Sequence, residues 1–371
     1  MRTCSHLVAR LIPIVILLLL PAACLGGTPT PAPPTATPRP LPAVQGRIAF
    51  LSDRSGTREL WLIGANGQHE TVLLPKQQLD IPPVWSPDGS QIAYGVNQGG
   101  KTALGVLMVN PDGTPGANRV LTQEPQDGDN SSPAWSPDAK ALAFQSSRSG
   151  AAQVYTVPVA GGAATALPGQ PALAGFPAWS PDGKTLVFAG GSATAKRELW
   201  TAPLGGGPAA QITNIGGDVA RPQWTHDGQA ILFLARAAGN TTFNISEIRP
   251  DGSGQRALTA GAYEDLGPVL SPDGAWIAFF SDRSTDSSGT AQSQNNEIYV
   301  MPRDATSVTN VTETPAGDTD PSWAPDNVHL VFASGRAGGY RLYVSGRDGA
   351  NPAPLTSGTG EYGDTFPVWS P

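Results

Sequence analysis

The chain has 371 residues, of which 44 are glycine, 37 are proline and only 14% are charged. Lysine and arginine number 23 against 30 aspartate and glutamate, so the net charge is −7. An acidic chain without a basic block argues against nucleic acids and anionic lipid surfaces as partners. The abundance of glycine and proline is typical of many short strands joined by tight turns.

Residues 1–23 have the pattern of a signal peptide, with two arginines, an apolar run over 11–20 and small residues before Cys24. The run is shorter than the roughly 20 apolar residues that a spanning helix needs. The end of this segment, Leu-Pro-Ala-Ala-Cys24, resembles a bacterial lipoprotein signal. That resemblance implies that Cys24 is lipidated and becomes the mature N-terminus. Plain secretion and an uncleaved anchor are the alternatives, and all three place the body of the protein outside the cytoplasm.

Residues 24–45 follow as a linker rich in proline and threonine, with seven prolines between Gly26 and Pro42. Such a segment favours extended polyproline II at about 3.1 Å per residue, which makes it a semi-rigid spacer. The only other cysteine, Cys4, lies in the signal segment. No disulfide within the mature chain is therefore expected.

A repeated phrase organises residues 46–371. It reads Trp-Ser-Pro-Asp-Gly at 85–89, followed by the apolar triplet Ile-Ala-Tyr at 92–94. Related phrases begin at Trp135, Trp179, Trp224, Leu270, Trp323 and Trp369, so the spacings are 44 to 53 residues. This is the period of β-propeller blades, each with four short strands. We predict an all-β, seven-bladed propeller with tryptophans packed between blades.

The two ends of the repeat region are complementary halves of one blade. The first strand-like segment, 48–50, matches a second strand, and residues 364–370 match an inner strand. Pairing the C-terminal strand with the N-terminal blade closes the ring and leaves no open sheet edge. The last repeat stops at Pro371, so an eighth blade beyond this point is the alternative.

Acidic and arginine residues recur at matching positions of the repeats. The acid lies about five residues before each anchor, and the arginine lies about four residues after the aromatic residue of the second strand. We predict intrablade ion pairs between loops, each contributing about 0 to 1 kcal/mol. The pairs are Asp364 with Arg54, Asp129 with Arg148, Asp218 with Arg236, Asp265 with Arg283, and Asp318 with Arg336. The alternative is a ring of acids around the central axis that binds a cation or a partner.

No constellation for catalysis, metal binding or a cofactor is evident. The turn aspartates occur once per blade, too far apart to surround an ion. The histidines at 6, 69, 226 and 329 are also widely separated, and no nucleophile elbow or nucleotide loop occurs. We therefore expect no metal, no cofactor and no enzyme activity.

The complete phrase, Trp-Ser-Pro-Asp-Gly-x-x-Ile-Ala-Phe-x-Ser-x-Arg, resembles the TolB-like propeller repeat, which is related to the WD-type repeats. The resemblance extends over residues 46–371. It implies a periplasmic or cell-surface β-propeller that binds other proteins. The repeat also resembles the propeller that covers the active site in prolyl oligopeptidase-like hydrolases.

These observations predict a monomeric, extracytoplasmic protein-binding or scaffold module that contacts the membrane through its lipid anchor alone. The expected partner is an unidentified envelope protein. The candidate contact is the long insertion of the sixth blade, where Asp286, Gln292, Gln294 and Asn295 lie. The alternative is a propeller hydrolase or lyase, or a carbohydrate binder, acting on glycans or peptides at the mouth of the central channel.

Overall fold

The computed structural model describes residues 41–122, 128–192, 196–283, 295–358 and 360–371. The chain divides into two units, Met1–Pro38 and Arg39–Pro371, and the fold below is that of the second. The predicted signal segment, Cys24 and most of the linker lie outside the described residues. In the described part, no helix is long and apolar enough to cross a membrane.

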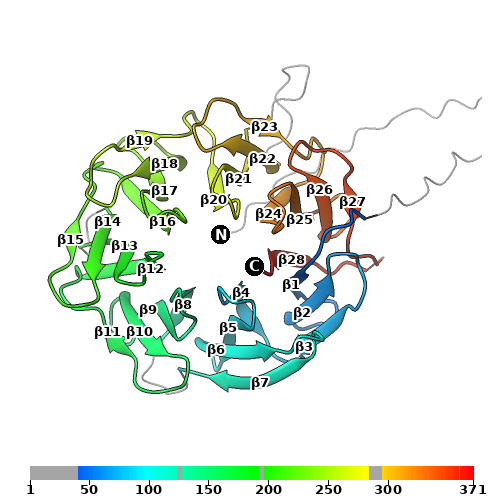
Figure 1. Ribbon diagram of the computed structural model, residues 1–371, viewed down its shortest axis with the longest axis horizontal. Coiled ribbons are helices and arrows are strands. Elements are labelled where there is room, and N and C mark those ends of the chain that lie inside the picture. The colour runs from blue at the N-terminus through cyan, green and yellow to red at the C-terminus, as the bar shows by residue number, and fades with distance from the viewer. Residues whose placement is uncertain (1–40, 123–127, 193–195, 284–294, 359) are drawn as a thin grey trace, which may run out of the picture. The chain divides into compact units, whose positions relative to one another are not determined.

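Seven four-stranded antiparallel sheets form the blades of a ring (Figure 1). Blade 1 contains β28 (Asp364–Trp369), β1 (Arg47–Ser52), β2 (Glu59–Gly64) and β3 (Thr71–Leu74). Blade 2 contains β4 (Leu79–Trp85), β5 (Gln91–Gln98), β6 (Lys101–Val109) and β7 (Pro115–Val120). Blade 3 contains β8 (Asn130–Trp135), β9 (Ala141–Ser146), β10 (Gln153–Pro158) and β11 (Thr165–Ala166).

The remaining blades repeat this order. Blade 4 contains β12 (Leu173–Trp179), β13 (Thr185–Gly191), β14 (Glu198–Pro203) and β15 (Ala210–Gln211). Blade 5 contains β16 (Asp218–Trp224), β17 (Ile231–Arg236), β18 (Asn244–Ile248) and β19 (Arg256–Ala257). Blade 6 contains β20 (Asp265–Leu270), β21 (Trp276–Ser281), β22 (Glu297–Pro302) and β23 (Thr309–Asn310). Blade 7 contains β24 (Asp318–Trp323), β25 (His329–Ser334), β26 (Arg341–Gly346) and β27 (Ala353–Pro354).

The second strand of each blade supplies the core. In β5, Ile92, Ala93 and Tyr94 are all fully buried, because blades pack on both faces of the strand. Strands covered on both faces read as continuous apolar runs, which explains the triplet after each turn. The aromatic residue of this triplet is fully buried in every blade: Phe50, Tyr94, Phe144, Phe188, Phe233, Phe279 and Phe332.

The turn between the first and second strands is held by its own polar side chains. The Asp88 carboxylate accepts hydrogen bonds from the Ser86 hydroxyl (2.6 Å) and the Ser90 amide (3.1 Å). Gly89 takes a φ of 67°, which glycine adopts without strain. The hydrogen bond from Ser86 lowers the pKa of Asp88. Among the described residues, no group of three or more His, Cys, Asp or Glu side chains is placed to hold a metal ion.

The anchor tryptophans join neighbouring blades through hydrogen bonds. In five blades the indole Nε1 donates to a backbone carbonyl of the preceding blade, at 2.9 to 3.3 Å. The acceptor always directly precedes the anchor of its own blade. The pairs are Trp85 with Val368, Trp135 with Val84, Trp179 with Ala134, Trp224 with Ala178, and Trp323 with Val269.

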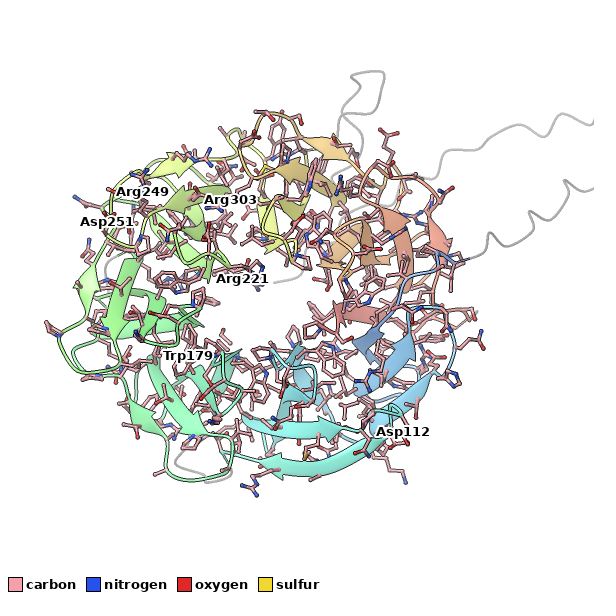
Figure 2. All side chains as sticks on the ribbon, in the orientation of Figure 1. Asp112, Trp179, Arg221, Arg249, Asp251 and Arg303 are labelled. Carbon is pink, nitrogen blue, oxygen red and sulfur yellow. The ribbon has the colours of Figure 1, made fainter. Side chains whose placement is uncertain are left out.

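Each inner strand also carries an irregularity three residues before its anchor, directly ahead of a proline. Non-glycine residues adopt positive φ at this place in five blades, and Gly267 does so in a sixth. The five are Ser132, Phe176, Arg221, Asp320 and Phe366. Figure 2 shows one of them, Arg221, at the inner margin of the ring. The strand bulges where it lines the central axis.

The ring closes as the sequence predicts. Strand β28 pairs antiparallel with β1, with Asp364 opposite Ser52 and Trp369 opposite Ile48. The hydrogen bond from Trp85 to Val368 then joins blade 2 to the C-terminal strand. The predicted all-β, seven-bladed propeller with four-stranded blades is therefore confirmed.

Trp85→Phe tests the blade-to-blade hydrogen bond at this closure. We expect the free energy of unfolding to fall by about 2 kcal/mol, because the Val368 carbonyl loses its buried donor and the smaller ring leaves space. The measurement is urea unfolding followed by circular dichroism. Trp61→Phe is the control, because the buried Trp61 Nε1 has no hydrogen-bond partner; its expected cost is below about 1 kcal/mol. Equal costs for both variants would contradict the role assigned to the hydrogen bond.

Candidate functional site

Arginine–acid pairs recur on one face of the ring. Asp265, Asp318 and Asp364 are the first residues of inner strands, and all three are fully buried. Their arginine partners lie two residues after the second strand of the same blade. The contacts are Arg54 to Asp364 (2.7 Å), Arg283 to Asp265 (2.5 Å) and Arg336 to Asp318 (3.1 Å). Because the blades repeat around the central axis, we call this side the arginine face, defined by Arg54, Arg148, Arg236, Arg283 and Arg336.

Each of these arginines makes further contacts besides its ion pair with the acid. The Arg336 guanidinium donates from Nε to the Ser334 hydroxyl (2.6 Å). It also lies over the rings of Phe332 and Tyr343, 5.7 and 4.5 Å from their centroids. Cations over aromatic faces gain electrostatic attraction. The serine and arginine of the repeated Ser-x-Arg phrase thus act together, binding the end of one strand to the start of another.

The pairs differ from the sequence expectation in their burial. We expected exposed pairs between loops, but the acids belong to strands and the arginines cover them. A buried carboxylate without its cation is strongly disfavoured, so these contacts have larger consequences than surface pairs. The alternative of an open acid ring around the axis is also inconsistent with carboxylates that are fully buried, as in Asp265, Asp318 and Asp364.

The predicted pair of Asp129 with Arg148 is wrong in its acid. Arg148 donates to the Asn130 side-chain oxygen at 3.2 Å, and Asn130 occupies the strand position that the acids hold elsewhere. The Asp129 carboxylate instead accepts a hydrogen bond from the Thr102 amide at 3.0 Å. A shift of one residue moves a side chain to the other side of the sheet, so the neighbouring acid cannot substitute.

Asp218 serves two arginines. Its carboxylate accepts two hydrogen bonds from Arg197, from Nε at 3.1 Å and Nη2 at 3.2 Å. It also lies 3.1 Å from Arg236, the predicted partner. Burial alone would raise the pKa of Asp218, but the hydrogen bonds and charges of the arginines lower it. The sequence comparison missed Arg197 because it lies outside the repeated Ser-x-Arg phrase.

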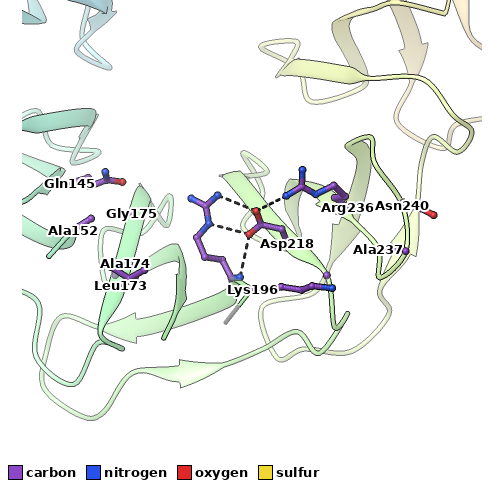
Figure 3. Close-up of a pocket in the computed structure, with 13 residues that line it drawn as sticks. Gln145, Ala152, Leu173, Ala174, Gly175, Lys196, Asp218, Arg236, Ala237 and Asn240 are labelled. Carbon is purple, nitrogen blue, oxygen red and sulfur yellow. Dashed lines mark hydrogen bonds and ion pairs between the residues drawn. The ribbon is translucent and has the colours of Figure 1, made fainter. Parts of the chain in front are cut away.

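A cavity of about 470 Å³ opens beside Asp218 (Figure 3). We call it the cationic cavity. Its lining residues are Gln145, Ala152, Leu173, Ala174, Gly175, Lys196, Arg197, Gly217, Asp218, Arg236, Ala237, Gly239 and Asn240. Ala174 occupies the place of the acid in blade 4, and Ser192 that of the arginine. The blade that lacks the pair therefore contributes small side chains where others carry a charged contact.

Most of the predicted partner loop, with Asp286, Gln292 and Gln294, falls within residues 284–294, which lie outside the described part of the chain. Asn295 is described and differs from the expectation. Its amide donates to the Glu297 carboxylate (2.8 Å) and to the Thr314 carbonyl (2.7 Å). Burial raises the pKa of Glu297 to about 7. Asn295 therefore fixes the base of the insertion instead of presenting a free contact.

Two exposed tyrosines lie on the arginine face. Tyr263 lies two residues before β20 and is 41% exposed, with the Arg283 guanidinium 5.6 Å from the centroid of its ring. Tyr340 directly precedes β26 and is 36% exposed. They are the aromatic members of a set of five exposed large hydrophobic side chains in the described part of the chain, with Met108, Val308 and Val328. No sequence pattern marks these two tyrosines, because their exposure depends on the path of the loops that carry them.

A double-mutant cycle on Arg336 and Asp318 tests the buried pair. Arg336→Gln should lower the free energy of unfolding by about 3 kcal/mol, because it leaves the Asp318 carboxylate buried without its cation. Adding Asp318→Asn should cost less than the sum of the two single changes, by at least about 1 kcal/mol. Chemical unfolding at neutral pH gives all four values. Strict additivity would show that the pair is not coupled.

Comparison with known proteins finds similarity to TolB proteins. The Tol-Pal system protein TolB of Bordetella pertussis is 30% identical over 157 residues, which cover 31% of this chain and 35% of the relative. The chain thus spans about a third of the length of the curated relatives it matches. Among solved structures, TolB from Acinetobacter baumannii is 19% identical with a TM-score of 0.52, covering 88% of this chain and 67% of that one.

A second fold neighbour is an enzyme. Oligogalacturonate lyase from Vibrio parahaemolyticus is 16% identical with a TM-score of 0.60, covering 81% of this chain and 86% of the lyase. At such identities these likenesses concern the fold alone. The family model described as the TolB beta propeller domain matches residues 41–291, well over half of the chain. With its seven closed blades and repeated Trp-Ser-Pro-Asp-Gly turns, this protein belongs to the TolB β-propeller domain family.

Proposed function

We propose that this protein is a membrane-anchored, extracytoplasmic β-propeller that binds another envelope protein through its arginine face, without catalysis of its own. The observation that carries the proposal is the exposure of Tyr263 and Tyr340 on the face where the arginines gather. Tyrosine and arginine are enriched among the residues that dominate protein–protein affinity. Tyrosine suits such contacts because its ring buries apolar area while its hydroxyl can hydrogen-bond to the partner.

The rigidity of this face supports the same proposal. The Tyr263 ring borders Arg283, which is itself held by Asp265 and by Ser281. Tyr340 is followed by Arg341, whose fully buried guanidinium donates to the carbonyls of Tyr362 and Gly360. Loops fixed in this way lose little conformational freedom on binding, so more of the contact energy remains as affinity.

The anchor is the second part of the proposal. Residues 1–23 act as a signal peptide, Cys24 carries the lipid, 24–45 form the spacer and 46–371 form the propeller. The supporting relative is a Tol-Pal system protein named TolB. A lipid anchor followed by a semi-rigid spacer lets the propeller face partners near the membrane.

Capture from envelope membranes tests the binding role. Full-length protein in mild detergent, coupled to beads, should recover one envelope protein reproducibly. The Tyr263→Ala/Tyr340→Ala variant should recover at least tenfold less of it, because truncating central aromatic contacts costs about 2 kcal/mol or more. Quantitative mass spectrometry of the eluates gives the ratio.

The control variant is Val308→Ala/Val328→Ala, which removes exposed apolar side chains that lie away from the arginine face. It should recover the partner as well as the unchanged protein does. If it loses the partner instead, the arginine face is not the contact. If no envelope protein is recovered and the isolated protein cleaves or binds oligosaccharides, the enzyme or carbohydrate alternative replaces this proposal.

Cys24→Ser tests the anchor separately. We expect the unchanged protein in the membrane pellet and the variant in the soluble extracytoplasmic fraction, because the lipid attachment site is removed. Immunoblots of fractionated cells provide the measurement, and Cys4→Ser is the matched control. Retention of the Cys24→Ser variant in the membrane would indicate an uncleaved N-terminal anchor.

A further inference from the structure

We propose that the cationic cavity binds a carboxylate group of an acidic polypeptide segment. The inference rests on the proposed protein-binding function and assigns part of it to a defined site on the arginine face. Figure 3 labels Lys196, Arg236 and Asp218 among the lining residues, and Arg197 joins them through its hydrogen bonds to Asp218. The cavity joins blades 4 and 5 and extends to Gln145 and Ala152 of blade 3.

The charge balance is the first argument. Three cationic side chains line the cavity against one carboxylate, that of Asp218. Glu198, two residues after Lys196, does not line the cavity; its carboxylate accepts hydrogen bonds from the amides of Ile215 and Gly216 at 3.1 and 3.0 Å. The cavity thus carries more positive than negative charge in an otherwise acidic protein, which favours an anion.

The second argument is that donors are available. Arg197 uses Nε and Nη2 for Asp218, and Arg236 uses Nη2 alone. A guanidinium has five N–H donors, so both arginines retain some for a second anion. The exposed Lys196 ammonium donates to the Gly216 carbonyl at 2.8 Å and has two further protons. Carboxylates match such donors with strong, charge-assisted hydrogen bonds.

The third argument is the pattern of the blades. In blades 1, 6 and 7, an arginine lies over aromatic rings and contacts a buried acid of its own blade, as Arg336 does with Asp318. Blade 4 lacks both members, with Ala174 and Ser192 in their places. Gly175 lets the Gln145 side chain approach this strand closely, because a Cβ on it would lie 1.8 Å from the Gln145 side-chain oxygen. An anion from outside can therefore enter where other blades supply their own.

The walls favour a polypeptide over an acidic sugar. Leu173, Ala174 and Ala237 give apolar surface for aliphatic side chains, and Gln145 and Asn240 can bond peptide amides. Sugar rings pack their C–H faces on aromatic side chains, and no aromatic residue is among those that line the cavity. A carboxylate carried by a peptide fits this mixture of groups best.

Fluorescence anisotropy with a labelled hexaglutamate peptide tests the inference on the full-length protein in detergent. We expect saturable binding that weakens at least tenfold between 50 and 500 mM NaCl, because screening reduces charge attraction. Lys196→Gln, an exposed position, should weaken binding about tenfold through loss of one charge-assisted contact. Arg236→Gln should weaken it similarly, with its thermal unfolding recorded to show that the ring is intact.

Lys184→Gln is the matched control, since it removes one exposed lysine from the Ser-Pro-Asp-Gly turn at the other end of blade 4. It should bind hexaglutamate as the unchanged protein does, and hexaglutamine should not bind. Equal weakening by Lys184→Gln and Lys196→Gln would overturn the inference in favour of unspecific charge attraction. Cavity-dependent binding of trigalacturonate without binding of hexaglutamate would overturn it in favour of an acidic sugar.

The same variants separate this inference from the proposed function. If Lys196→Gln captures the envelope partner unchanged while Tyr263→Ala/Tyr340→Ala does not, the arginine face binds protein and the cavity has no part in it. If the unchanged protein and both variants all recover no envelope partner, the proposed function itself fails.

Discussion

The hydrogen bond from the anchor tryptophan to the preceding blade is the interaction on which the rest of this structure depends. It joins the inner strand of one blade to the inner strand of its neighbour, as Trp135 does with Val84. In five blades the acceptor directly precedes an anchor, so at these junctions the bond repeats and holds neighbouring inner strands in a common rotation. The bond from Trp85 to Val368 applies the same rule at the C-terminal strand, and the pairing of β28 with β1 closes the ring.

That rotation also determines where the functional groups lie. Inner strands that share one direction bring their first residues to one face, which places Asp265, Asp318 and Asp364 beside the arginines that follow the second strands. The arginines bury the acids and stack on core aromatics. These ion pairs and cation–π contacts stabilise the blade. They also make the arginine face rigid and hold the remaining guanidinium N–H groups in place.

Most of the fold could be predicted from the sequence, because the repeat encodes it directly. The spacing of the tryptophans gave the number of blades, and the complementary ends gave the closure. The pairing of acid with arginine was also visible, yet its details were not. Asn130 replaces Asp129 because strand register, which spacing alone leaves uncertain by one residue, decides which side chain faces Arg148. The burial of the acids depends on the conformations of the arginine side chains, which the sequence pattern does not specify.

The cationic cavity shows why a binding site within a regular repeat can escape prediction from the sequence. The sequence shows that blade 4 lacks the ion pair, because Ala174 and Ser192 stand where other blades have an acid and an arginine. Its consequence, a hollow bordered by Lys196 and Arg197, depends on residues outside the repeated phrase and on loops from three blades. Asp218 then has two effects: it neutralises one positive charge, and it holds two guanidinium groups within about 3 Å of one carboxylate. Groups that would otherwise repel one another are thereby pre-positioned, so a second anion meets ordered donors and need not order them itself.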